Sequence, residues 1–151
     1  MIAYKDIKKA INRQLSKTGV DINSSDVTEG FERPSFFVQL INPIRSANEN
    51  QVHKAMTVQI YYFPSDRYEN SIEVLDMQDQ LEELFDLKLS VHDRLLDINE
   101  LNTDLIDGVL NCSFDLEFYD GRNKEWKPED EREFYEKYPS ELMEELDFEK
   151  E

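Results

Sequence analysis

Few side chains in this chain could carry out acid–base chemistry. The 151 residues include two histidines, His53 and His92, which lie in different segments without ligand-spaced partners. His92 precedes Asp93, and a histidine oriented by a carboxylate can act as a general base. Every His-Asp dipeptide resembles such a pair in the sequence. Only the geometry of the two side chains defines a catalytic pair, and adjacency does not supply it. We therefore expect no enzymatic activity, no catalytic residue and no cofactor.

The single cysteine, Cys112, lies in a stretch where apolar and polar residues alternate. This alternation predicts a strand that carries the thiol on its apolar face. A buried, unreactive thiol is the favoured interpretation, and a nucleophile is the less favoured one. A single cysteine also excludes an internal disulfide and any metal site built from several cysteines.

One polar stretch has side-chain oxygens of the kind that bind calcium. It contains Asp97, Asn99, Asn102, Asp104 and Asp107. A calcium loop needs a fixed order of aspartates, a glycine and a terminal glutamate, and this stretch has neither that order nor the glutamate. We interpret it as a turn-rich connection. The sequence also lacks a nucleophile elbow, a phosphate-binding glycine loop and a zinc-protease motif, so no metal site is expected.

The composition narrows the range of partners. The formal net charge is −17, from 34 acidic and 17 basic residues. This charge disfavours direct binding to nucleic acid or to an anionic membrane, because both need a basic protein face. It is compatible with a basic protein partner, and it also explains solubility without any partner. No apolar run approaches the roughly 18 residues of a membrane span, and no secretory signal is present, so we expect a cytoplasmic protein.

The elements that would position a binding surface begin with an N-terminal helix. Apolar residues recur at three- and four-residue steps, which predicts a helix from Tyr4 to Leu15. The apolar positions are Tyr4, Ile7, Ala10, Ile11 and Leu15. Gly19 is expected to act as its C-cap. The other side of the helix is basic and includes Lys8 and Arg13. A solvated face is the simpler interpretation, and a docking face for an acidic neighbour is the alternative.

Two strands separated by a polar arm are predicted next, after a weaker strand over Val20–Val27. The first strand alternates from Phe36 to Ile41 and is expected to end at Asn42-Pro43. The stretch from Ile44 to Gln51 is polar and predicts a long hairpin arm or a mobile loop. The second strand runs from His53 to Phe63.

The second half of the chain predicts a central helix and further strands. Apolar spacing predicts the helix over Ser71–Phe85, with its first residue as the N-cap. Short strands are expected over Leu87–Val91 and Leu95–Asn99, and Asp107-Gly108 is a tight-turn signal. The stretch from Val109 to Tyr119 alternates most clearly, which is typical of an antiparallel sheet with one buried face.

These elements predict an α+β fold. The predicted sheet is mainly antiparallel, has about four to six strands and is packed by the N-terminal helix and the second, central helix. The predicted domain covers residues 1–124. The composition becomes strongly acidic after Lys127-Pro128, and residues 125–151 are expected to form an acidic helical C-terminal extension.

Two features favour a surface for other subunits. Tyr61 and Phe63 lie on the second face of their strand, which favours a sheet covered on both sides by helices or by a neighbouring subunit. The polar arm and the basic helix are suitable contact elements, and opposite charges on the helix and on the rest of the chain would orient adjacent subunits. The candidate contact residues are Arg45, Asn48, Glu49, Asn50, Lys8 and Arg13.

Three segments together resemble one protein family. They are Tyr4–Asn12, Gly30–Val38 and Thr57–Phe63, in the order helix, strand, strand. Over about residues 1–120 the chain resembles the tail terminator proteins of long-tailed phages and of related prophages in Gram-positive bacteria. The acidic residues that follow lie outside this resemblance.

The resemblance implies a structural virion protein without catalytic residues. Proteins of this kind are small α+β subunits that assemble as a ring, commonly a hexamer, on the finished tail tube. The ring stops tube polymerisation and offers a surface for head-tail joining. The implied partners are further copies of the chain, the tail tube protein and the head-tail connector protein, in the host cytoplasm during assembly and then in the virion tail. The alternative is a small acidic intracellular adaptor module that engages a basic partner.

Overall fold

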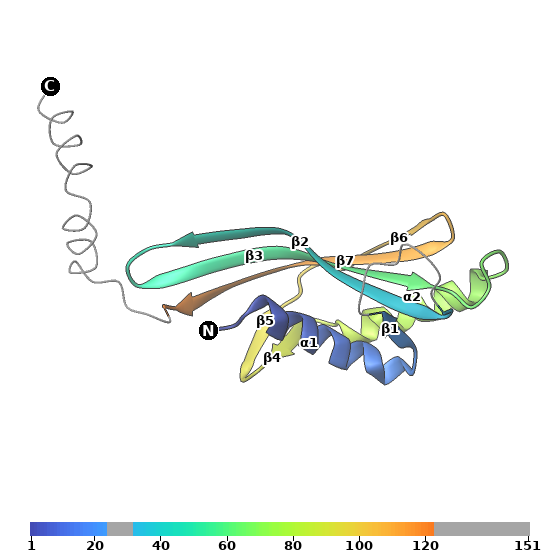
Figure 1. The fold of residues 1–151 in the computed structure, drawn as a ribbon, viewed down its shortest axis with the longest axis horizontal. Helices are drawn as coiled ribbons and strands as arrows, with labels where there is room; N and C mark the ends of the chain where they lie inside the picture. The colour runs from blue at the N-terminus through green and yellow to red at the C-terminus, as the bar shows by residue number, and fades with distance from the viewer. Residues whose placement is uncertain (24–31, 123–151) are drawn as a thin grey trace, which may run out of the picture.

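The computed structural model describes residues 1–23 and 32–122 (Figure 1). Within these ranges, one large sheet forms the body of the protein, and two helices and a small second sheet pack against it. The predicted acidic extension over residues 125–151 lies outside the described residues. The predicted strand over Val20–Val27 is described only in its first part, where Asp21–Asn23 forms a short strand.

The main sheet has five strands in the order β1-β2-β3-β7-β6. β1 runs parallel to β2, and the other neighbouring pairs are antiparallel. The strands are β1 (Asp21–Asn23), β2 (Ser35–Ala47), β3 (Gln51–Phe63), β6 (Asn102–Ile106) and β7 (Val109–Gly121). The predicted α+β fold with a mainly antiparallel sheet is therefore confirmed.

One face of the main sheet is covered by the remaining elements (Figure 1). They are α1 (Tyr4–Leu15), the short 3₁₀ turn η1 (Ser16–Thr18), α2 (Ser71–Leu84), β4 (Lys88–Val91) and β5 (Arg94–Asp97). Both helices lie where apolar spacing predicts them. Gly19 follows η1 with a φ of +79°, a left-handed conformation that glycine adopts readily at a helix end. None of the helices in the described ranges is long and apolar enough to cross a membrane.

The start of α2 differs from the prediction. Ser71 is already the first helical residue, and Asn70 is the N-cap, without a side-chain capping bond. The Asn70 amide instead donates to the backbone oxygens of Asp66 at 3.0 Å and Arg67 at 3.2 Å. The short polar side chain therefore stabilises the preceding loop, where it competes with the capping role.

The core lies between the main sheet and the helices that cover it. Alternation along β7 directs every second side chain toward the helices, and these side chains are buried. The largest fully buried side chains include Phe36, Phe85, Phe114, Ile7, Ile11 and Leu81. They come from both helices, from β2 and β7, and from the end of α2, so one continuous apolar core joins all layers.

The predicted burial of Cys112 is confirmed, since the thiol lies in the core on β7. Burial raises the pKa of this thiol to about 12, with a smaller contribution from the Glu82 carboxylate. We expect the native protein not to react with a chromogenic thiol reagent at about pH 8, because almost no thiolate forms there. The reagent should release its chromophore only after denaturant is added. Rapid reaction of the folded protein would contradict this prediction.

The predicted end of the first long strand at Asn42-Pro43 is wrong, because β2 continues to Ala47. The pairing with β3 shifts its register between Ile41 and Ile44, so two residues of β2 lie opposite one residue of β3. These residues suit a β-bulge, since Asn42 adopts a φ of +53° and Pro43 has no N–H to lose from the ladder. Beyond the bulge the side chains of β2 exchange faces, so Ile44 points away from the helices.

The predicted polar arm is a β-hairpin. β2 and β3 stay paired up to a turn that spans residues 48–50. The side-chain Oδ1 of Asn48 accepts hydrogen bonds from the backbone N–H groups of Asn50 at 2.8 Å and Gln51 at 2.9 Å. Such bonds are typical of asparagine in turns. We call residues 44–52 the hairpin arm, and Figure 1 shows that it extends beyond the layer that contains α1 and α2.

The predicted turn-rich connection is only partly correct. Residues Asn102–Ile106 form β6, an edge strand that pairs with β7. This strand is hard to recognise in the sequence, because its residues do not alternate between a buried face and a solvent-exposed face. The predicted turn at Asp107-Gly108 is confirmed, since both residues have positive φ values, +52° and +76°, as a tight hairpin turn requires.

Candidate functional site

One face of the main sheet is turned away from α1, α2 and the small sheet (Figure 1), and we call it the open face. The register places Phe37 beside Tyr61 and Gln39 beside Gln59 on this face. The rings of Phe37 and Tyr61 stack with centroids 6.0 Å apart, and both residues are half-buried. Tyr61 and Phe63 therefore share this second face, as their alternation predicts. Its cover by a neighbouring subunit stays a prediction.

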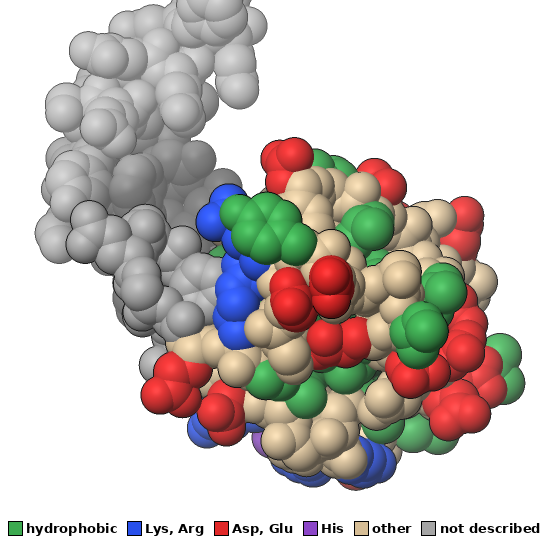
Figure 2. Space-filling model, turned by 90° about the vertical axis from the view of Figure 1, so that its right-hand side faces the viewer, with side chains coloured by type: hydrophobic (Ala, Val, Ile, Leu, Met, Phe, Trp, Pro, Cys, Tyr) green, Lys and Arg blue, Asp and Glu red, His purple; other side chains and the backbone are tan. Residues whose placement is uncertain are grey.

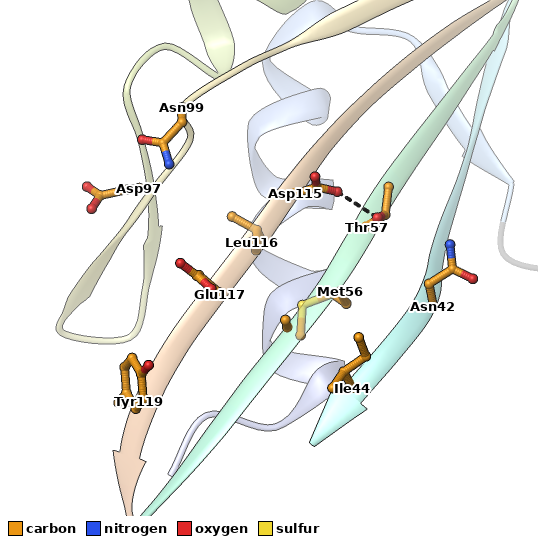
Figure 3. A pocket seen from close by; sticks show the side chains of 11 residues that line it. Asn42, Ile44, Met56, Thr57, Asp97, Asn99, Asp115, Leu116, Glu117 and Tyr119 are labelled. Carbon is orange, nitrogen blue, oxygen red and sulfur yellow. Dashed lines mark hydrogen bonds between the residues drawn. The ribbon is translucent and has the colours of Figure 1, made fainter. Parts of the chain in front are cut away.

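The open face is hollowed into a groove of about 660 Å³ next to the β-bulge (Figure 3). β2 and β3 form one side of the groove and β7 forms the other. Asp97 at the end of β5 and Asn99 in the following segment add a polar rim. The strand residues whose side chains line it include Asn42, Ile44, Thr57, Asp115, Glu117 and Tyr119.

Each carboxylate of the groove has a partner within the chain. Thr57 Oγ1 donates a hydrogen bond to Asp115 Oδ1 at 2.6 Å. His53 Nε2 lies 3.2 Å from Glu117 Oε2. The third carboxylate, Asp97, forms an exposed ion pair with the ammonium group of Lys88 at 2.5 Å. These contacts moderate the negative charge of the groove but do not remove it, because a hydroxyl group is neutral and exposed ion pairs are weak.

The groove is better suited to docking than to catalysis. Ile44 is 61% exposed and Tyr119 is 56% exposed, so apolar surface lies beside the carboxylates. A surface of this kind fits the basic and apolar side chains of another protein. Within residues 1–23 and 32–122, no group of three or more His, Cys, Asp or Glu side chains is arranged to hold a metal ion.

The two histidines connect different elements of the fold. On the open face, the ring of His53 packs against the ring of Tyr119 with centroids 4.5 Å apart. His92 lies in the β4–β5 turn with a φ of +54°, and its Nε2 is 3.1 Å from Asp6 Oδ2. Its side-chain contact is therefore with Asp6 of α1 rather than with the adjacent Asp93, and the geometry of a base oriented by that neighbour is not formed.

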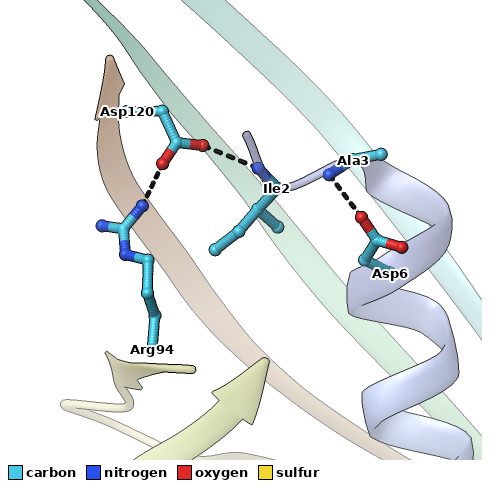
Figure 4. Close-up of polar contacts among 5 residues, drawn as sticks. All are labelled: Ile2, Ala3, Asp6, Arg94 and Asp120. Carbon is cyan, nitrogen blue, oxygen red and sulfur yellow. Dashed lines mark hydrogen bonds and ion pairs between the residues drawn. The ribbon is translucent and has the colours of Figure 1, made fainter. Parts of the chain in front are cut away.

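The N-terminus is anchored to the last strand of the sheet (Figure 4) at Asp120, which pairs with Val52 close to the turn of the hairpin arm. Asp120 on β7 accepts a hydrogen bond from the backbone N–H of Ile2 at 2.8 Å and forms an ion pair with Arg94 on β5. Asp6 Oδ2 accepts a hydrogen bond from the backbone N–H of Ala3 at 2.9 Å, and this bond is the main reason why the pKa of Asp6 is lowered. These contacts fix the start of α1 against the sheet.

The predicted contact residues fall on two separate surfaces. The arm carries Arg45, Asn48, Glu49 and Asn50, all exposed, whereas α1 on the covered side of the sheet carries Lys8, half-buried, and Arg13, exposed. Asn48 also has a structural role, because its side chain holds the turn and its backbone oxygen accepts a hydrogen bond from Arg122 Nη1 at 2.9 Å. Contact of these residues with a partner stays a prediction.

Sequence reasoning missed the groove. The alternation along β7 places Asp115, Glu117 and Tyr119 on one polar face, and this signal was available. The β-bulge that turns Ile44 onto the same face and the position of Asp97 at its rim follow from pairings between distant segments, which one sequence does not reveal.

Comparison with protein families adds an independent observation. The family model described as phage tail terminator protein matches residues 6–129, which is most of the chain and nearly all of the described fold. A comparison with curated proteins finds no match. The family match agrees with the resemblance carried by the three segments from α1, β2 and β3. The chain belongs to the phage tail terminator protein family, and it is accordingly a structural protein of the phage tail.

Proposed function

We propose that copies of this protein assemble as a closed ring, a hexamer by the resemblance, that ends the phage tail tube. The ring stops polymerisation of the tail tube protein and offers its other side to the head-tail connector protein. The family supports this proposal, and so does an open sheet face that leaves aromatic and aliphatic side chains uncovered by the described elements. Assembly takes place in the host cytoplasm, and the ring remains in the virion tail.

The hairpin arm is the part of the subunit that we propose contacts a neighbouring subunit or the tube. Residues 44–51 are exposed one after another, which is unusual for two strands that remain paired to their tip. The groove lies at the base of the arm on the open face, so a partner that contacts the arm also reaches Ile44 and Tyr119. Apolar side chains beside carboxylates would accept basic and apolar side chains of that partner.

The proposal predicts that the protein limits the length of tail tubes. Purified tail tube protein should form long tubes alone and shorter tubes, closed at one end, when a small molar fraction of this protein is present. Electron microscopy of the mixture measures tube lengths and shows the closing density. Tubes of unchanged length with no density at either end would refute the proposal, and binding to a basic protein instead would favour the acidic adaptor alternative.

A pair of variants tests the arm. Replacing residues 44–52 with a short Asn-Gly turn should abolish capping, because the exposed contact surface is removed. Ile44→Asp keeps the arm but places a charge in the groove, and it should raise the amount of protein needed to shorten tubes about tenfold. Glu100→Lys, an exposed change outside the arm, is the matched control. If the arm deletion keeps both the wild-type mass in light scattering and the capping activity, the arm has no such role.

A further inference from the structure

The exposed side of α1 carries a row of positive charges. Its members recur every four residues and are all exposed: Lys5, Lys9, Arg13 and Lys17, the last in η1. Residues four apart lie above one another on a helix, at intervals of about 6 Å along its axis. We call these four residues the basic stripe. The buried side of the same helix, with Ile7, faces the core, so the basic stripe points away from the sheet.

The exposed side of α2 and its C-terminal end carry the opposite charge. The carboxylates are Asp76, Asp79, Glu82, Glu83 and Asp86, all exposed, and we call them the acidic patch. Ile72 and Leu75 on the same helix are 76% and 61% exposed. Figure 2 views the end of the molecule where α2 lies, and hydrophobic side chains appear there among Asp and Glu side chains.

Neither surface is neutralised by the other within the described part of the chain. α1 and α2 touch, since Gln14 Nε2 donates to the backbone oxygen of Leu84 at 2.8 Å. Nevertheless, no ion pair between described residues includes a member of the basic stripe or of the acidic patch. The carboxylates of the groove differ, because each of them has a partner in the chain.

The arrangement is unfavourable for an isolated subunit. Like charges three and four residues apart repel one another along both helices. The last turn of α2 carries no basic residue, so its carboxylates lie at the helix end where the backbone dipole disfavours negative charge. A cationic partner at α2 would relieve both effects, and the exposed Ile72 and Leu75 would gain cover from the alkyl stems of lysine and arginine side chains.

We infer that the basic stripe of one copy docks against the acidic patch of the next copy. Both surfaces are helical and repeat at similar intervals, so several charges can pair in one contact. In the inferred arrangement each copy offers its basic stripe to one neighbour and its acidic patch to another, so the contact is heterologous and leaves one free surface at each end until the assembly closes. The inference rests on the proposed function only for the closure into a ring, and the contact itself is a property of this chain.

Charge reversal on each helix tests this contact in the purified full-length protein. Lys9→Glu with Arg13→Glu reverses two of the four charges of the basic stripe, and Asp79→Lys with Glu83→Lys reverses two of the five charges of the acidic patch. Each double variant alone should need at least about ten times more protein than the wild type to assemble, as sedimentation velocity measures it. An equimolar mixture of the two variants should recover assembly, because each contact between the two variants again joins opposite charges at the substituted positions. High salt should weaken the wild-type assembly.

The control variant is Glu100→Lys with Asp104→Lys, which changes the net charge by the same amount as the α2 variant. Asp104 lies in β6 and Glu100 lies just before it, so neither substitution is on a helix. It should assemble like the wild type. Circular dichroism confirms that each variant is folded, and the mixture serves as the internal check if one variant is less stable. A wild-type protein that remains monomeric at every concentration, single variants with wild-type mass, or a mixture that stays dissociated would each overturn the inference. Assemblies that do not shorten tail tubes would count against the proposed function alone.

Discussion

Replacing Phe114 with alanine is expected to lower the free energy of unfolding by about 3–5 kcal/mol. The side chain is only 2% exposed and lies in the middle of β7, the strand that pairs with both β3 and β6. Its ring packs against that of Phe85 at the end of α2 with centroids 5.2 Å apart, so the substitution leaves a cavity between the sheet and its helical cover. Urea unfolding followed by circular dichroism measures the change.

Tyr119→Ala is the matched control on the same strand. Its side chain is 56% exposed and faces the groove rather than the core, so we expect a loss below about 1 kcal/mol. A typical domain has about 5–15 kcal/mol of stability, so the Phe114 variant should unfold at clearly lower denaturant concentration than the control. Similar midpoints for the two variants would show that the core does not depend on the contact between β7 and α2.

Asp120→Ala is expected to destabilise the fold by about 2 kcal/mol. The Asp120 side chain is 10% exposed, and it binds both the Arg94 guanidinium and the backbone N–H of Ile2. Removing it leaves a half-buried guanidinium and an amide donor without their acceptor. The Arg94 side chain is 36% exposed and regains water in part, so the loss is smaller than for a fully buried pair. Thermal unfolding at neutral pH measures the effect.

Asp97→Ala provides the comparison for an exposed ion pair. Lys88 and Asp97 are 50% and 66% exposed, and surface pairs of this kind contribute about 0–1 kcal/mol. We therefore expect little change in the midpoint of unfolding. If Asp97→Ala cost as much as Asp120→Ala, the burial of Asp120 would not be the reason for its importance.

The elements with strong periodicity could be predicted from the sequence. α1 was predicted with its observed ends because its apolar residues share one helical side, although its C-cap is Ser16 and the predicted C-cap, Gly19, ends the following 3₁₀ turn. β7 was predicted because each apolar residue between Leu110 and Phe118 alternates with a more polar one. In both cases a single face is buried, and the repeat of the backbone therefore appears directly in the order of residue types.

The parts that could not be predicted depend on contacts between distant segments. Asn42-Pro43 indicates a strand end, because turn-forming residues and proline usually interrupt a ladder, yet here the ladder continues through a bulge. β6 lies at the sheet edge and has no fully buried residue, so its residue order shows no strand repeat. The groove combines residues from four segments, so it follows from pairings that the order of residue types does not show.

The β-bulge also limits how the arm can change in length. Before it, the even-numbered side chains of β2 face the helices, and after it they face the groove. Losing one of the two bulge residues would restore a regular ladder, in which Ile44 lies two residues after Ile41, still opposite Ala55 and still on the groove side. Losing both would place Ile44 directly after Ile41, on the opposite face, and would exchange the β2 side chains that line the groove for those that now face the other way.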